Sequence, residues 1–212
     1  MRLALWAALL VPVAAMVLGL KRKKFAWNCV LTLSCATIVA LTGRGMMVAP
    51  LIAALGLSII GDFFMAHKKD RTMWYIGGIS GFLLAHIAFI WYAAGRFAGN
   101  ARIYLAGAAL IFMLGYYLKT RVLPKLQDKP MQIAVSLYAL ISGISVIAAA
   151  AMHAPEFERL LFAVGIALIA FSDMMIAETD FVGSRECSVY IMPAYHLCHI
   201  LVAASAVVGM SV

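Results

Sequence analysis

The chain has 212 residues, of which 65% are hydrophobic and only 12% are charged, and its formal net charge is +8. A soluble domain is closer to half apolar and a quarter charged, and no polar stretch here is long enough to form one. The basic residues do not cluster into a domain of their own, which excludes a nucleic-acid-binding protein. The composition predicts a single polytopic membrane domain over residues 1–212.

Eight apolar runs follow one another along the chain, each close to the roughly 20 residues that cross a hydrocarbon core as a helix. The runs are continuous and do not alternate in polarity, so they predict an all-α integral membrane protein and not a β-barrel. The first run precedes the basic residues 21–24, and we interpret it as a retained helix and not a signal peptide. The predicted spans are Leu3–Leu20, Phe25–Thr42, Met47–Ala66, Tyr75–Ala94, Ile103–Leu118, Met131–Met152, Leu160–Ala177 and Ser188–Gly209.

The basic residues predict an orientation. Twelve of the 17 Lys and Arg residues fall in the loops after the first, third, fifth and seventh spans. Because cytoplasmic loops concentrate Lys and Arg, both termini are predicted to lie on the non-cytoplasmic side. The compact loops and the absence of eukaryotic sorting signals favour a bacterial inner membrane.

Two carboxylates lie within these apolar runs. Asp62 is near the end of the third span and Asp173 near the end of the seventh, so the predicted topology places both in the cytoplasmic half of the membrane. An acid in hydrocarbon is costly and therefore marks a candidate functional site. We predict that both carboxyl groups face one cavity that opens toward the inner leaflet.

The surroundings of the two aspartates are alike. Residues 61–66 and 172–177 share the pattern small residue, Asp, three apolar residues, Ala. His86 follows Asp62 by 24 residues, and His196 follows Asp173 by 23. This indicates a four-plus-four parallel repeat with halves 1–100 and 101–212, and folds of this kind place their site between the halves. A chance similarity of short segments is the alternative.

Several other polar residues are predicted at the depth of the aspartates. His86, Tyr195, His196 and His199 could orient the carboxyl groups or a water, and His196 and His199 share a helix face. Two close carboxyl groups can share one proton, so that one acts as an acid while the other activates water. The sequence leaves open which aspartate has which role. Three further acids, Glu178, Asp180 and Glu186, are interpreted as solvated loop residues.

Gly61-Asp62, the segment Gly81–His86, the segment Ser172–Ala177 and Tyr195 resemble the YhhN family of lysoplasmalogenase-like membrane proteins. The resemblance implies a hydrolase that cleaves the vinyl ether bond of a lysoplasmalogen to a fatty aldehyde and glycerophospho-ethanolamine or -choline. Its partners would be the lysophospholipid, water and membrane lipid, with no cofactor. Asp62 and Asp173 would be catalytic, with His86 and Tyr195 supporting them. His199 stands where the family tends to have glutamine.

Two other functions fit the same residues. A zinc-dependent lipid hydrolase would use His86, His196, His199 and an aspartate as metal ligands, although the predicted site contains no metal. A proton-coupled transporter or a lipid-binding membrane protein would use intramembrane acids and a parallel repeat.

Overall fold

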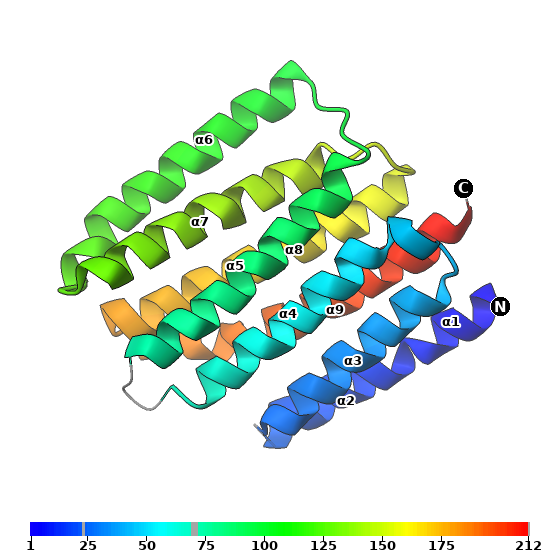
Figure 1. The fold of residues 1–212 in the computed structure, drawn as a ribbon, viewed down its shortest axis with the longest axis horizontal. Helices are drawn as coiled ribbons and strands as arrows, with labels where there is room; N and C mark the ends of the chain where they lie inside the picture. Colours follow the sequence, from blue (N-terminus) through cyan, green and yellow to red (C-terminus); the bar gives the residue numbers. More distant parts are fainter. Residues whose placement is uncertain (23, 69–71, 212) are drawn as a thin grey trace.

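The protein is a bundle of α-helices in a computed structural model that describes residues 1–22, 24–68 and 72–211 (Figure 1). Seven segments of the described chain are long and apolar enough to cross a membrane, with α1 and α2 counted together, and α3 is a shorter apolar helix. The predicted all-α integral membrane protein with about eight spans is therefore confirmed. The helices are α1 (Arg2–Ala8), α2 (Leu10–Arg22), α3 (Phe25–Leu41), α4 (Ala49–Ala66), α5 (Thr72–Ala94), α6 (Ala101–Tyr117), α7 (Lys129–Ala150), α8 (Glu156–Ala177) and α9 (Ser188–Val208).

Local sequence explains where some helices begin and end. The first span is divided at Leu9, between α1 and α2. Pro12 lies three residues later and has no N–H to donate to the carbonyl of Ala8, which weakens the helix there. Two π-helical turns, Leu118–Val122 and Glu178–Val182, extend α6 and α8 beyond the predicted ends of the spans. Lys23 and residues 69–71, part of the predicted basic loops, lie outside the described residues.

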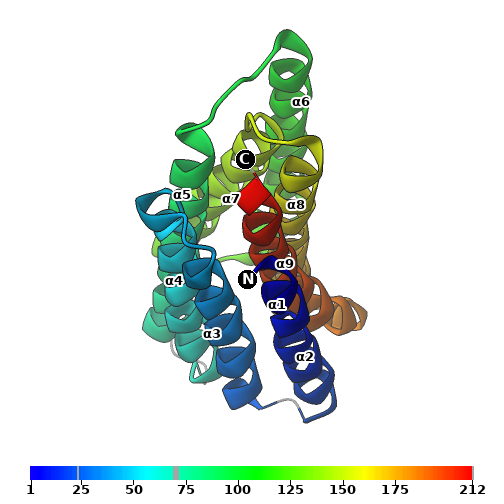
Figure 2. The ribbon, with the colours of Figure 1, turned by 90° about the vertical axis from the view of Figure 1, so that its right-hand side faces the viewer.

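The helices alternate in direction, so α4 and α8 run the same way while α5 and α9 return, and both termini lie at one end of the bundle (Figure 1). The closest packing is between α4 and α5 and between α8 and α9. Helix α9 lies at the centre, where it also contacts α3 and α2, whereas α6 stands at the edge and packs mainly on α7 (Figure 2). Outward-facing side chains such as Leu105 and Phe112 are apolar and exposed, as lipid-facing residues are.

Glycine brings the backbones of α4 and α5 together beside Asp62. A Cβ atom on Gly81 would lie 2.8 Å from the backbone nitrogen of Gly61 and 2.9 Å from its Cα. Small residues allow such close approach of membrane helices. The pairing holds Asp62, the next residue of α4, against the middle of α5.

The two most extensive interfaces between residues 1–100 and residues 101–212, within the described chain, are α5 on α7 and α3 on α9. Helix α5 is the fourth span of the first half and packs on α7, the second span of the second half. Helix α9 is the fourth span of the second half and packs on α3, the second span of the first half. Two equivalent halves would make such a reciprocal pair of contacts, which is consistent with the parallel repeat; the repeat itself stays a prediction.

Candidate functional site

Asp62 and Asp173 line one cavity of about 620 Å³. The cavity lies toward the end of the bundle where α2, α4 and α8 finish, which we call the lysine end because Lys24 and Lys68 also line it. Tyr195 from α9 contributes to the wall. The two intramembrane carboxyl groups thus share an amphiphilic space with basic side chains at the same end.

Asp173 is held by residues from two other helices. The Tyr138 hydroxyl of α7 donates a hydrogen bond of 2.6 Å to Asp173 Oδ2, and Nε2 of His86 on α5 lies 3.3 Å from the same oxygen. The His86 ring is fully buried, and its Nδ1 lies 2.8 Å from the Ser145 hydroxyl oxygen. That hydroxyl in turn donates to the carbonyl of Ser142 at 2.7 Å.

A chain of contacts thus runs from Asp173 through the His86 ring to Ser145 and the carbonyl of Ser142. A neutral imidazole donates a hydrogen bond from one nitrogen and accepts one at the other. The His86 ring is therefore placed where it can exchange a proton with the Asp173 carboxyl group.

Asp62 has a different set of partners. The Tyr195 hydroxyl donates to Asp62 Oδ2 at 2.9 Å. Tyr195 is packed by Phe82 and by His199, with ring centroids 6.0 Å and 4.4 Å from its own. Within the described residues, no histidine is hydrogen-bonded to Asp62. The two carboxyl groups are thus chemically unequal.

His196 and His199 lie behind the cavity wall and do not line it. His196 Nε2 contacts Asn28 Oδ1 at 3.0 Å, and Asn28 lines the cavity. His199 Nδ1 contacts the backbone carbonyl of Tyr195 at 2.8 Å. The structure therefore places both as supports of residues that reach the cavity, while His86 supports Asp173 directly.

Each aspartate is hydrogen-bonded to a residue from the other half of the chain. Asp62 belongs to residues 1–100 and binds Tyr195, whereas Asp173 belongs to residues 101–212 and binds His86. Sequence reasoning missed Asn28 and Tyr138, although a signal existed. They are 110 residues apart, almost the spacing of 111 between the aspartates.

The ligand set of the zinc alternative is not brought together. In residues 1–22, 24–68 and 72–211, no group of three or more His, Cys, Asp or Glu side chains is placed so that it could hold a metal ion. His86, His196 and His199 instead contact Ser145, Asn28 and a backbone carbonyl.

One predicted loop acid is placed differently. Glu178 lies in the π-helical turn that continues α8, and it is buried. It accepts hydrogen bonds from the Tyr117 hydroxyl at 2.8 Å and the Ser184 hydroxyl at 2.9 Å, and Arg121 lies 3.4 Å away. The solvated-loop interpretation was wrong for Glu178 because these partners compensate its burial. Asp180, in the same turn, is exposed and pairs with Lys68.

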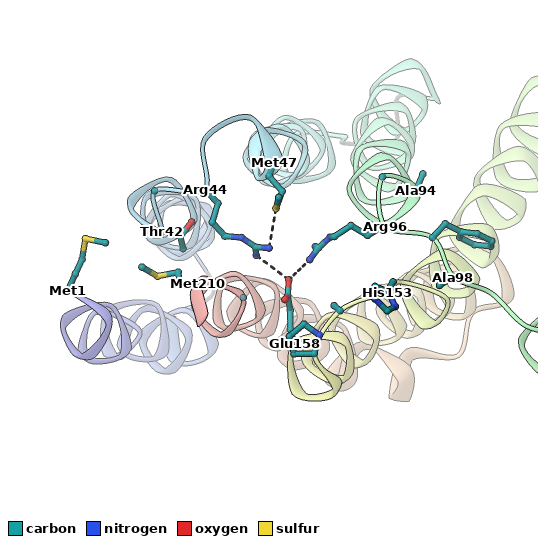
Figure 3. Close-up of a pocket in the computed structure, with 16 residues that line it drawn as sticks. Met1, Thr42, Arg44, Met47, Ala94, Arg96, Ala98, His153, Glu158 and Met210 are labelled. Atoms are coloured by element: carbon teal, nitrogen blue, oxygen red, sulfur yellow. Dashed lines mark hydrogen bonds and ion pairs between the residues drawn. The ribbon is translucent and has the colours of Figure 1, made fainter. Parts of the chain in front are cut away.

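A second polar cluster lies at the terminal end of the bundle, in a cavity of about 1470 Å³ (Figure 3). Its centre is Glu158, whose side chain is 1% exposed. Arg44 and Arg96 approach it at 3.1 Å and 2.8 Å, and the Tyr92 hydroxyl donates to it at 3.1 Å. The cluster ties the turn after α3 and the end of α5 to the start of α8.

Comparison with known proteins agrees with the resemblance. The model of the YhhN family matches residues 23–206 of the chain, which include the whole aspartate cavity except its first two lining residues, Gly19 and Leu20. No curated protein and no solved structure matches the chain.

Proposed function

The chain belongs to the YhhN family, and from this premise we propose that it is a membrane-embedded hydrolase that cleaves the vinyl ether bond of a lysoplasmalogen. The products are a fatty aldehyde and glycerophospho-ethanolamine or -choline. One observation carries the proposal: two carboxyl groups face one cavity, and one of them contacts a buried histidine. A vinyl ether is labile to acid, so this is the chemistry that such a pair suits.

In the proposed first step, Asp173 is the acid. It transfers its proton to the second carbon of the alkenyl chain, and the electron pair of the double bond forms the new C–H bond. The resulting positive charge is shared by the first carbon and the ether oxygen. His86 lies 3.3 Å from this carboxyl group and would exchange a proton with it between turnovers. After the transfer, the ionised carboxylate stabilises the cation, as preorganised charges do at a transition state.

In the second step, Asp62 is the base. A water in the cavity attacks the first carbon and gives a proton to Asp62, which forms a hemiacetal. The hemiacetal then collapses: Asp62 returns its proton to the ether oxygen, the carbon–oxygen bond breaks, and the hydroxyl proton passes to Asp173. One water is consumed and both aspartates are restored. General acid–base catalysis of this kind contributes roughly 10²–10⁴-fold in rate.

The cavity lining supports the choice of a lysophospholipid. Lys24 fits a phosphate at the lysine end, where Lys68 is paired with Asp180. Apolar contacts are offered by Phe25, Met65 and Phe82. We place the lysine end at the cytoplasmic face of a bacterial inner membrane, so that substrate enters from the inner leaflet.

The test is aldehyde release by purified protein from a lysoplasmalogen, beside the saturated ether lysolipid. Only the vinyl ether should react, and in deuterated water the aldehyde should carry one deuterium on its second carbon. Asp62→Asn and Asp173→Asn should each abolish turnover without loss of folding. Glu156→Gln, an exposed acid that lines no described cavity, is the matched control and should keep full activity.

A fully active Asp62→Asn or Asp173→Asn variant would remove that residue from the mechanism. If no aldehyde is released, the transporter alternative is measured directly. Uptake of lysolipid into sealed vesicles that follows an imposed proton gradient would then assign the intramembrane acids to transport.

A further inference from the structure

Asp173 faces a second space besides the aspartate cavity. This apolar chamber, of about 250 Å³, lies between α6, α7 and α8. Leu110 and Leu114 line it from α6, Ala139 and Val146 from α7, and Ala167 from α8. Asp173 is the one charged side chain among the described residues of its wall.

The aspartate cavity and the apolar chamber adjoin at Asp173. A small space of about 50 Å³ lies between them and also includes Asp173 in its wall. Phe82 belongs to the walls of this small space and the cavity, and Tyr138 to those of the small space and the chamber. A cavity with polar and basic lining residues therefore lies next to an apolar one, with the Asp173 carboxyl group in the wall of both.

We propose that the apolar chamber binds the hydrocarbon chain of the single-chain lipid substrate and thereby sets which carbon lies at Asp173. This inference rests on the proposed function. In a vinyl ether lysolipid the reacting bond is where the polar glycerol joins the chain, and Asp173 is where the polar cavity joins the chamber. The carbon to be protonated lies on the chain side of that bond, which is the chamber side of Asp173.

The position of α6 gives the chain a way in. Helix α6 packs mainly on α7 and makes little contact with α8, so one side of the chamber is bounded by two helices that are not packed tightly together. A chain that leaves the bilayer for this chamber exchanges one apolar surrounding for another and gains little hydrophobic free energy. The chamber therefore determines where the reacting bond lies relative to Asp173 and adds little to the affinity for the lipid.

The test narrows the chamber away from the catalytic residues. Ala167 precedes Asp173 by six residues, about 9 Å along α8, and is exposed enough to accept a larger side chain. Ala167→Phe should lower kcat/KM for a hexadecenyl lysolipid by about 100-fold, since a displacement of 1 Å at the reacting atoms can cost that much. For a short butenyl lysolipid, which does not reach Ala167, kcat/KM should stay within about twofold of the parent value.

Ala108→Phe is the matched control, because Ala108 is an exposed alanine of α6 that does not line the chamber. It should leave both substrates unaffected. If Ala167→Phe lowers kcat/KM equally for the long-chain and short-chain substrates, or for neither, the chamber does not bind the hydrocarbon chain. Either result would leave the proposed reaction intact.

A binding measurement separates the chamber from the reaction itself. A saturated ether lysolipid with a diazirine in its chain should label chamber residues such as Leu114 and Ala139, and unlabelled lysolipid should suppress that labelling. Labelling of the outer face of α6, at Leu105 and Phe112, should resist competition because bulk lipid covers it. If unlabelled lysolipid suppresses labelling at no residue, the chamber is not a binding site for the hydrocarbon chain, even if aldehyde is released. If it suppresses labelling in the chamber but no aldehyde is released, the binding site is supported and the proposed reaction is refuted.

Discussion

At the residue scale, hydrogen-bond accounting separates two aspartates that look equivalent in the sequence. Asp173 contacts His86 Nε2, and the other nitrogen of the same ring contacts Ser145. Asp62 accepts a hydrogen bond from Tyr195 and has no histidine bonded to it among the described residues. In the proposed reaction we therefore give the two residues different roles, with Asp173 as the acid and Asp62 as the base.

The histidine provides the sharpest test of that assignment. His86→Gln keeps a hydrogen-bond donor beside Asp173 but cannot exchange a proton with it. We expect kcat to fall by about 10²-fold, at the lower end of what acid–base catalysis supplies, with KM little changed. Steady-state aldehyde release measures both constants. His153→Gln, an exposed histidine at the terminal end of the bundle, should behave like the parent protein.

An unchanged kcat in His86→Gln, with thermal stability preserved, would show that Asp173 keeps its proton without the histidine. A loss of folding would be seen as a lowered unfolding temperature. In that case Ser145→Ala, which removes the partner of Nδ1 at the far side of the ring, gives the same test with less disturbance and should also lower kcat.

The aspartates could be predicted from the sequence because a carboxyl group in an apolar run is rare and costly. Tyr138 and Asn28 could not be singled out in this way, since an aromatic or an amide in a span is unremarkable. Glu158 was missed for another reason. Its burial depends on Arg44 and Arg96, which approach the start of α8 from the turns after α3 and α5, and contacts between segments so distant in the chain leave no pattern in the sequence.

At the element scale, the contact between α4 and α5 depends on glycine at Gly81. Gly81→Ala places a methyl group 2.8 Å from a backbone nitrogen, and backbone cannot move aside as a side chain can. We expect a loss of about 1–3 kcal/mol, the usual cost of overpacking. Thermal unfolding in a constant detergent measures it.

Gly56→Ala is the control for Gly81→Ala. Gly56 lies in α4, and a Cβ atom added to it would have no neighbour within 4 Å among the described residues. The same substitution there should be neutral or slightly stabilising, since alanine favours helix more than glycine does. Equal unfolding temperatures for the two variants would show that the helices separate easily at Gly81.

Span lengths were predictable because the thickness of the hydrocarbon core sets them. The ends of the helices were not. The π-helical turn Glu178–Val182 continues α8 past the apolar run, and Glu178 within it is bound by Tyr117, Arg121 and Ser184. Such an extension depends on partners distant in sequence, which apolar periodicity does not contain.

At the scale of the whole molecule, the two termini lie at one end of the bundle (Figure 1), and the aspartate cavity lies toward the other. The distribution of Lys and Arg predicts that the lysine end faces the cytoplasm. A C-terminal alkaline phosphatase fusion expressed in a bacterium should therefore be active, and a C-terminal green fluorescent protein fusion should be dark. The opposite pair of results would reverse the orientation and move the cavity to the outer leaflet.

The three spaces that adjoin at Asp173 also bear on the fate of the two products. On the proposed reaction, the aldehyde is formed with its chain in the apolar chamber and the glycerophosphodiester is formed beside Lys24 and Lys68. One product then dissolves in the bilayer and the other in water. Because they are diluted into separate phases, they rarely meet again at the site, and the hydrolysis is drawn toward completion. An enzyme that next consumes the aldehyde would have to collect it from the membrane.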